Sequence, residues 1–140
     1  MITLPSGPWM EVAVDLAGPF PLGEYLLVVI DEYSRFPEVD VISSTSAKTV
    51  IPHLDMIFSR HGIPDVVKTD NGPPFNGNEF QTFSKDFWFR KITPLWPEAN
   101  GEAERFMATL NKHVLAATAE NSNWLNQLLQ FLRHYRATPP

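Results

Sequence analysis

Hydrophobic and polar positions follow strand-like patterns in the first part of the chain. Between Trp9 and Asp15 the residues alternate, with one apolar face and one mixed face, which is typical of a strand. We expect this strand to end at Asp15, beside a turn. The continuous apolar run from Tyr25 to Ile30 indicates a strand buried on both faces. Residues Glu38 to Ile42 are expected to form a third strand, antiparallel to the second.

Helical spacing begins after the serine- and threonine-rich stretch at residues 43–46. Apolar residues then recur every three or four positions, and Gly62 is expected to end this helix. Pro52 lies inside the pattern and should kink the helix or delay its start. A fourth strand is expected from Ile63 to Thr69.

A short helix and a fifth strand are expected next. Asn78 and Gln81 fit a capping box at the start of the helix. Its inner face is expected to be aromatic and to contain Phe80, Phe83, Phe87 and Trp88. The fifth strand is expected from Phe89 to Thr93.

Two longer helices are expected to complete the domain. The first has an apolar stripe formed by Ala103, Phe106, Met107, Leu110, Val114 and Ala117. Asn123 is expected to cap the last helix, whose apolar face would contain Trp124, Leu125, Leu128, Leu132 and Tyr135. The complete order of elements predicts an α/β domain, with a mixed sheet flanked by helices.

The composition narrows the class of protein. The chain has 140 residues, 44% of them hydrophobic and 19% charged, as expected for one globular domain, and no apolar run reaches membrane-spanning length. The absence of cysteine excludes disulfides and cysteine-containing zinc sites. The net charge of -5 counts against a free-standing nucleic-acid-binding domain. An enzyme whose carboxylates hold divalent cations is the exception, because those cations meet the phosphates.

Three acidic residues are candidates for such chemistry. Asp70 follows a short β-branched run and precedes a turn rich in glycine and proline, and Asp15 is expected in a similar position. Asp is unfavourable inside strands, and Asx-turn chemistry is one explanation for Asp70. Glu104 lies in the first turn of a helix, where the helix dipole favours an acid in any protein. If the three meet over one sheet edge, their repulsion requires cations, and oxygen ligands suit Mg²⁺ or Mn²⁺.

Ordered blocks over nearly the whole chain resemble the catalytic core of retroviral and LTR-retrotransposon integrases of the Ty3/Gypsy kind, in the ribonuclease H-like superfamily. The blocks comprise residues 9–19, 29–36, 61–64, 69–75, 100–106 and 134–139. The resemblance implies a five-stranded mixed sheet flanked by α-helices. It also implies that residues 1–140 form one catalytic core domain, without the N-terminal zinc domain and C-terminal DNA-binding domain of full integrases.

The resemblance assigns the catalytic and metal-binding roles to Asp15, Asp70 and Glu104, with two Mg²⁺ or Mn²⁺ ions per active site. Glu102 is the rival for the third position. It points about 200° away from Glu104 around the helix, and only Glu104 stands three residues after the glycine of the family pattern.

Two further residues are candidates for DNA contact. Asn71 either helps to place a metal-bound group or only shapes the turn. Lys112 either contacts a DNA phosphate or is a solvated helix lysine. The run Trp96-Pro97-Glu98 stands where the family usually has a His-Pro-Gln-like run.

The implied activity is DNA 3′-end processing and strand transfer, by which element DNA is inserted into a genome in the nucleus. The implied partners are element and target DNA, a second copy bound through the first and last long helices, a higher oligomer in the full-length protein, and a host protein that tethers the complex to chromatin. Two alternatives remain. One is another ribonuclease H-like nuclease or transposase, and the other is a domesticated, non-enzymatic protein- or DNA-binding module.

Overall fold

The structure is a computed structural model that describes residues 5–94, 101–119 and 123–138. The strands are β1 (Glu11–Ala17), β2 (Tyr25–Asp31), β3 (Pro37–Ile42), β4 (Val66–Lys68) and β5 (Arg90–Ile92). The helices are α1 (Ala47–His61), α2 (Asn78–Phe87), α3 (Gly101–Ala119) and α4 (Trp124–Ala137). This order confirms the predicted order of elements. No helix within the described ranges is long and apolar enough to cross a membrane.

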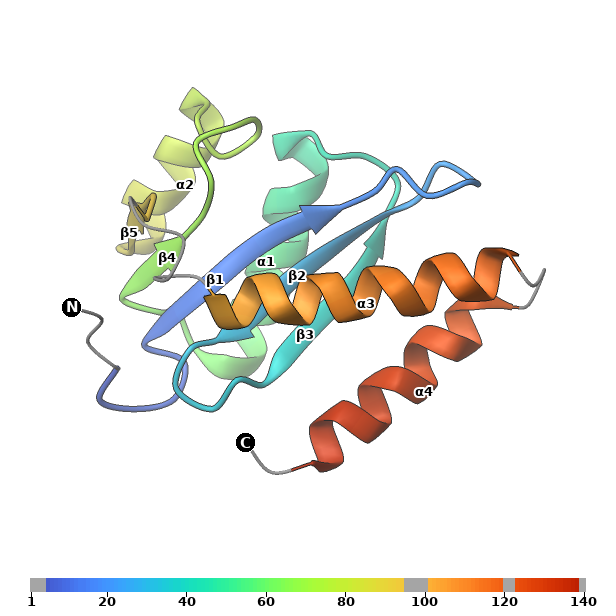
Figure 1. Ribbon diagram of the computed structural model, residues 1–140. Helices are drawn as coiled ribbons and strands as arrows, with labels where there is room; N and C mark the ends of the chain where they lie inside the picture. The colour runs from blue at the N-terminus through green and yellow to red at the C-terminus, as the bar shows by residue number, and fades with distance from the viewer. Residues whose placement is uncertain (1–4, 95–100, 120–122, 139–140) are drawn as a thin grey trace.

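The strands form one mixed sheet in the order β3-β2-β1-β4-β5. The pairs β1–β2 and β2–β3 are antiparallel, whereas β1–β4 and β4–β5 are parallel. Helices α1 and α2 cover one face of the sheet, and α3 and α4 cover the other (Figure 1). The predicted α/β architecture is therefore confirmed.

Each face of the sheet has its own hydrophobic core, and the central strands contribute to both. Leu27 and Val29 of β2 point into the core beneath α1 and α2, whereas Val28 points into the core beneath α3 and α4. The prediction that this strand is buried on both faces is confirmed. The six predicted apolar residues of α3 are also all buried.

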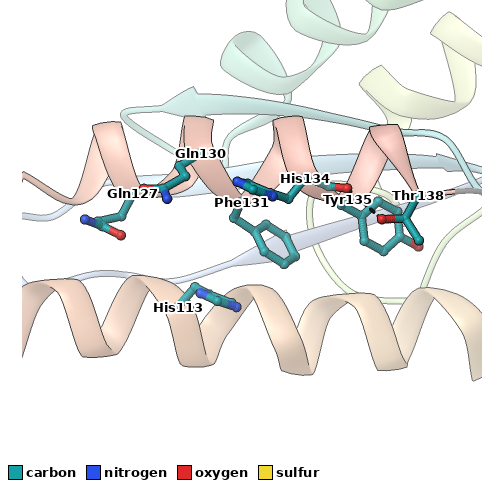
Figure 2. Close-up of a pocket in the computed structure, with 7 residues that line it drawn as sticks. All are labelled: His113, Gln127, Gln130, Phe131, His134, Tyr135 and Thr138. Carbon is teal, nitrogen blue, oxygen red and sulfur yellow. Dashed lines mark hydrogen bonds between the residues drawn. The ribbon is translucent and has the colours of Figure 1, made fainter.

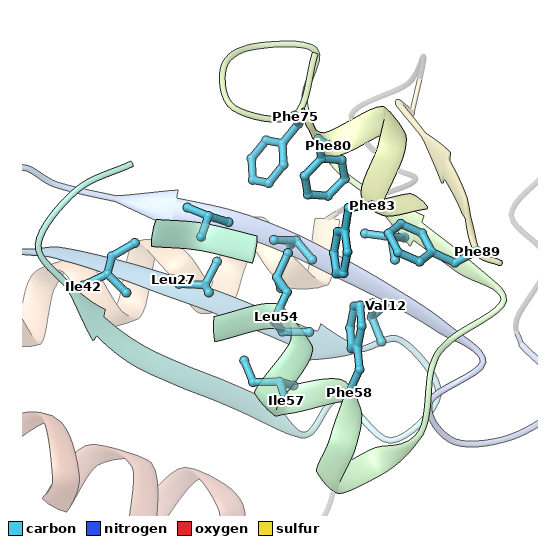
Figure 3. Close-up of a cluster of buried hydrophobic side chains, with 14 residues drawn as sticks. Val12, Leu27, Ile42, Leu54, Ile57, Phe58, Phe75, Phe80, Phe83 and Phe89 are labelled. Atoms are coloured by element: carbon cyan, nitrogen blue, oxygen red, sulfur yellow. The ribbon is translucent and has the colours of Figure 1, made fainter. Parts of the chain in front are cut away.

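An aromatic cluster connects α2 to the first core. Phe80 is fully buried, and its ring meets those of Phe75, Phe83 and Phe89 edge-on at centroid distances of 5.2, 5.7 and 6.2 Å. Figure 3 shows these rings between α2 and the sheet. Because Phe75 belongs to the turn after Asp70, this cluster holds that turn against the core.

All five strands differ in length from the prediction, β2 and β3 by only one residue each. β1 begins at Glu11 because Trp9 has a left-handed backbone (φ 59°) and donates its N–H to Asp31. It continues to Ala17, so Asp15 lies inside the strand, paired with Val28, and the prediction of a strand-end position was wrong. β4 and β5 have only three residues each, because β4 pairs with only three residues of β1 and of β5.

The delayed start of α1 and two predictions about α2 were also wrong. Pro52 neither interrupts nor delays α1, whose buried residues on either side keep the helix against the core. The N-cap of α2 is Gly77 and no side chain caps it, so Asn78 and Gln81 form no capping box. Trp88 is the C-cap of α2, has a left-handed backbone and is 90% exposed rather than part of the inner face.

The last helix agrees with the prediction except at one position. Asn123 caps α4, because its side chain accepts the N–H groups of Leu125 and Asn126. Leu128 and Leu132 are buried as expected. Leu125 is 44% exposed, and Phe131 packs against the core instead.

Candidate active site

The register of the central parallel strands brings the first two carboxylates to the same end of the sheet. β1 and β4 pair Glu11 with Val66 and Ala13 with Lys68. Asp15 follows Ala13 by two residues in β1, and Asp70 follows Lys68 by two residues in the turn after β4, so both lie beyond the carboxyl end of this pairing. Because strand residues alternate, Asp15 shares the face of Ala13 and Ala17, which pack in the core beneath α3.

Asp15 is half-buried, and its surroundings oppose its negative charge. Its Oδ1 accepts the N–H of Leu16 at 2.8 Å. Burial raises the pKa of Asp15 above its ordinary value, and the negative charges of Asp70 and Glu104 raise it further, against the effect of the Leu16 N–H. The structure therefore brings all three predicted carboxylates within electrostatic range of one another.

Asp70 is exposed in the turn that follows β4. Its Oδ1 accepts the N–H of Gly72 at 2.8 Å, which is the Asx-turn geometry considered from the sequence. A Cβ at position 72 would lie 3.3 Å from this same oxygen, so glycine lets the backbone approach the carboxylate closely. The turn thus holds one oxygen of Asp70 and leaves the other exposed.

Glu104 reaches the site from a different element. Ala103, Phe106 and Met107 pack α3 onto the sheet, and Glu104 is exposed in the first turn of this helix. The side chain of Glu102, its predicted rival, and the run Trp96-Pro97-Glu98 lie outside the described residues.

The donor set fits a hard divalent cation, although the carboxylates do not converge to ligand distances. In the ranges that the structure describes, no three acidic or histidine side chains are arranged to hold a metal ion. All three donors are nevertheless carboxylates, which Mg²⁺ and Mn²⁺ prefer. A cation would also relieve the repulsion that raises the pKa of Asp15.

An ion pair beside the site was not predicted from the sequence. Lys68 Nζ donates to Glu32 Oε2 at 2.8 Å, and the two side chains are 11% and 19% exposed. Burial raises the pKa of Glu32, Lys68 lowers it, and Glu11 and Asp31 raise it. The partners are 36 residues apart, so no local pattern signals this contact. Because Lys68 is engaged here, it does not compensate the charge of the triad.

The two DNA-contact candidates occupy different places. Asn71 is exposed in the turn beside Asp70. Lys112 is exposed on α3, eight residues or about 12 Å along the helix from Glu104. The structure brings Asn71, but not Lys112, into the immediate surroundings of the carboxylates.

A hollow between α3 and α4 is separate from this site (Figure 2). Its lining includes His113, Phe131 and Tyr135, and the rings of His113 and Phe131 lie 4.6 Å apart. His113 follows Glu104 by nine residues, about 13 Å along α3. No carboxylate lines this hollow among the described residues, so it adds no acid to the site.

The order and directions of the strands are those of a ribonuclease H-like fold. Comparison with known structures supports this class. A chain of the simian T-cell lymphotropic virus intasome, solved in complex with the PP2A regulatory subunit B56 gamma, superposes with a TM-score of 0.78, at 23% identity over 94% of this chain and 50% of that one. The HTLV-2 integrase catalytic core domain in complex with magnesium gives 0.72, at 21% identity over 94% and 86%.

Sequence comparisons identify the family. The family model described as Integrase core domain matches residues 11–93. An uncharacterized protein of Caenorhabditis elegans is 37% identical over 97% of this chain, and the Gag-Pol polyprotein of walleye dermal sarcoma virus is 32% identical over 97%. The chain spans 11% and 8% of the lengths of these two relatives. The chain belongs to the integrase core domain family.

Proposed function

We propose that this chain is the catalytic core of an integrase, a metal-dependent polynucleotidyl transferase and endonuclease, with Asp15, Asp70 and Glu104 as its catalytic and metal-binding residues. The observation that carries this proposal is that β1, the turn after β4 and the first turn of α3 bring Asp15, Asp70 and Glu104 within electrostatic range of one another in a chain of the integrase core domain family. Mutually repelling carboxylates at a partly open sheet edge are well suited to a divalent cation.

The proposed cofactor is Mg²⁺ or Mn²⁺, with two ions per active site. Such ions, when bound, stabilise charge on the attacking and leaving oxygens of a phosphodiester. The part played by the chain is to orient the ligands. The N–H of Leu16 holds one oxygen of Asp15, and the N–H of Gly72 holds one oxygen of Asp70. In each case the second oxygen remains for a ligand, and α3 supplies Glu104.

The proposed reaction is DNA 3′-end processing followed by strand transfer. In the first step water attacks a phosphodiester near the DNA end, a P–O bond breaks, and a 3′-hydroxyl is released. In the second step that hydroxyl attacks a target phosphodiester, so that one P–O bond forms as another breaks. Neither step requires a nucleophile from the protein.

The proposed partners are element and target DNA and a second copy of the chain, in the nucleus. The expected dimer would use α1 and α4, and both carry exposed apolar side chains. Met56 of α1 is 57% exposed, and Leu125 and Leu129 of α4 are 44% and 46% exposed. HTLV-2 integrase cores have been solved in dimeric and trimeric forms. We propose a higher oligomer and a chromatin-tethering host protein for the full-length protein.

Calorimetry and a DNA cleavage assay together test this proposal. The parent chain, Asp70→Asn and Asp55→Asn are titrated with Mn²⁺ and then incubated with labelled DNA in the same buffer. Asp55 is exposed on α1, across the sheet from α3, so its variant is a matched control for loss of charge. We expect the parent and Asp55→Asn to bind Mn²⁺ and cleave DNA, and Asp70→Asn to do neither. A parent that neither binds nor cleaves would contradict the proposal and favour a domesticated, non-enzymatic module.

A further inference from the structure

A polar hollow lies directly beside the turn that carries Asp70, between α2 and β5. Its volume is about 370 Å³. Its polar lining consists of Asn71 and Asn76 from the turn and the loop after it, Gln81 and Ser84 from α2, and Lys91 from β5. Asn71 is adjacent to Asp70 in the chain, so the hollow and the carboxylate site share one turn.

The side chains around this hollow offer hydrogen-bond donors and one positive charge. Lys91 is the only charged residue among those that line it in the described part of the chain. Within the same described ranges, Lys91 makes no ion pair, and the side-chain amides of Asn71 and Gln81 make no hydrogen bond. Ser84 is engaged, because its hydroxyl donates to the carbonyl of Phe89 at 3.2 Å. The free groups are therefore an ammonium and primary amides.

An anion with several acceptor oxygens matches this set of donors, and a backbone phosphate of DNA is such an anion. Each strand of a duplex carries one phosphate per roughly 3.4 Å of helix axis. A strand whose reacting phosphate lies at Asp70 therefore carries a neighbouring phosphate within a short distance, on the side of Asn71 or on the opposite side. The chain as a whole has a net charge of -5, and Lys91 is the positive charge that lines the hollow beside the turn of Asp70.

We propose that this hollow binds one backbone phosphate of the DNA strand on which Asp15, Asp70 and Glu104 act. Lys91 supplies the opposite charge, and Asn71 and Gln81 donate hydrogen bonds from their amides. Lys91 is thus a positioning residue that sets the path of the strand. This inference rests on the proposed function for the location of the reacting phosphate.

The first test measures how DNA affinity depends on salt for the parent, Lys91→Gln and Lys48→Gln. Lys48 is exposed on α1 and does not line the hollow, so both variants lose the same charge. A phosphate contact contributes about 0.9 to the steepness of log affinity against log salt concentration. Between 1 M and 0.1 M salt, this increment corresponds to a change of roughly 8-fold in affinity. We expect Lys91→Gln to lose one such increment and Lys48→Gln to keep the parent slope. Thermal melting of each variant verifies that it is folded.

The second test replaces single phosphates of the DNA by neutral methylphosphonates. At one position near the reacting phosphate, the parent should lose affinity and Lys91→Gln should lose nothing further. Equal slopes for the two lysine variants, equal responses to every methylphosphonate, or no DNA binding by the parent would each overturn the inference. A different result is also possible: Lys91→Gln shows the smaller salt slope, but the parent and Asp70→Asn both fail to cleave DNA in Mn²⁺. That result would support the phosphate site and contradict the proposed function.

Discussion

Replacing Phe80 by leucine tests whether the aromatic cluster fastens the turn of Asp70 to the core. Phe80 is fully buried and meets three rings edge-on, one of which is Phe75 in that turn. Leucine keeps an apolar side chain at this position but removes the ring. An edge-on aromatic pair contributes roughly 0.5–1.5 kcal/mol beyond the area it buries. Three pairs therefore predict a loss of roughly 1.5–4.5 kcal/mol, a large part of the 5–15 kcal/mol that is typical of a domain.

Urea denaturation followed by tryptophan fluorescence measures this loss. Phe87→Leu is the matched control, because Phe87 is half-buried and, among the residues that the structure describes, has a single ring contact, with Phe83 at 4.6 Å. We expect Phe80→Leu to lower the midpoint at least twice as much as Phe87→Leu, at an unchanged m-value. We also expect only Phe80→Leu to weaken Mn²⁺ binding, because only Phe80 contacts Phe75. Equal losses for the two variants, or a loss below about 0.5 kcal/mol for Phe80→Leu, would refute the reasoning.

Three further predictions concern Asp15, Lys68 and Asn123. The pKa of Asp15 is raised in the folded state, so its ionised form opposes folding once the pH passes that raised value. In metal-free buffer Asp15→Asn should therefore raise the Tm at pH 7. This gain in Tm should vanish as the pH falls below 3.8, the ordinary pKa of an aspartate side chain. A gain in Tm that does not depend on pH would contradict the prediction. Lys68→Met leaves Glu32 without its partner and should lower the free energy of unfolding by roughly 3 kcal/mol at neutral pH. The loss should be smaller in acid, because Glu32 then takes up a proton, and urea titrations at two pH values measure the difference. Asn123→Ala removes the cap of α4 and should cost about 1 kcal/mol in the same assay, and no change would mean that the cap contributes nothing.

The elements that could be predicted from the sequence are those whose burial repeats regularly. The apolar stripe of α3 is buried because its residues return to the same side of the helix at each turn and face one core. The continuous apolar run of β2 is buried because successive side chains point alternately into the two cores. Asp15 and Asp70 were recognised as acids beside expected strand ends. Their closeness depends on the β1–β4 register, which local periodicity does not contain.

The wrong predictions concern places where local preference competes with distant contacts. β1 was expected to end at Asp15, but pairing with β2 extends the strand to Ala17 and places the carboxylate inside it. Trp88 fits the aromatic spacing of α2, yet it takes the left-handed position that ends the helix and is exposed. The contact between Lys68 and Glu32 joins two strands far apart in the chain, so only the folded sheet reveals it.

The division of the interior into two cores has a consequence for the three carboxylates. Asp15 belongs to β1, and Asp70 belongs to the turn after the adjacent strand β4, which Phe75 fixes to the core beneath α1 and α2. Glu104 belongs to α3, which rests on the other core alone. The sheet and the turn after β4 therefore carry two of the acids, and a helix packed on one face of that sheet carries the third. Sliding or tilting of α3 on the sheet would change the distance to Glu104 while Asp15 and Asp70 keep their places, and an ion bound by all three would fasten α3 to the sheet.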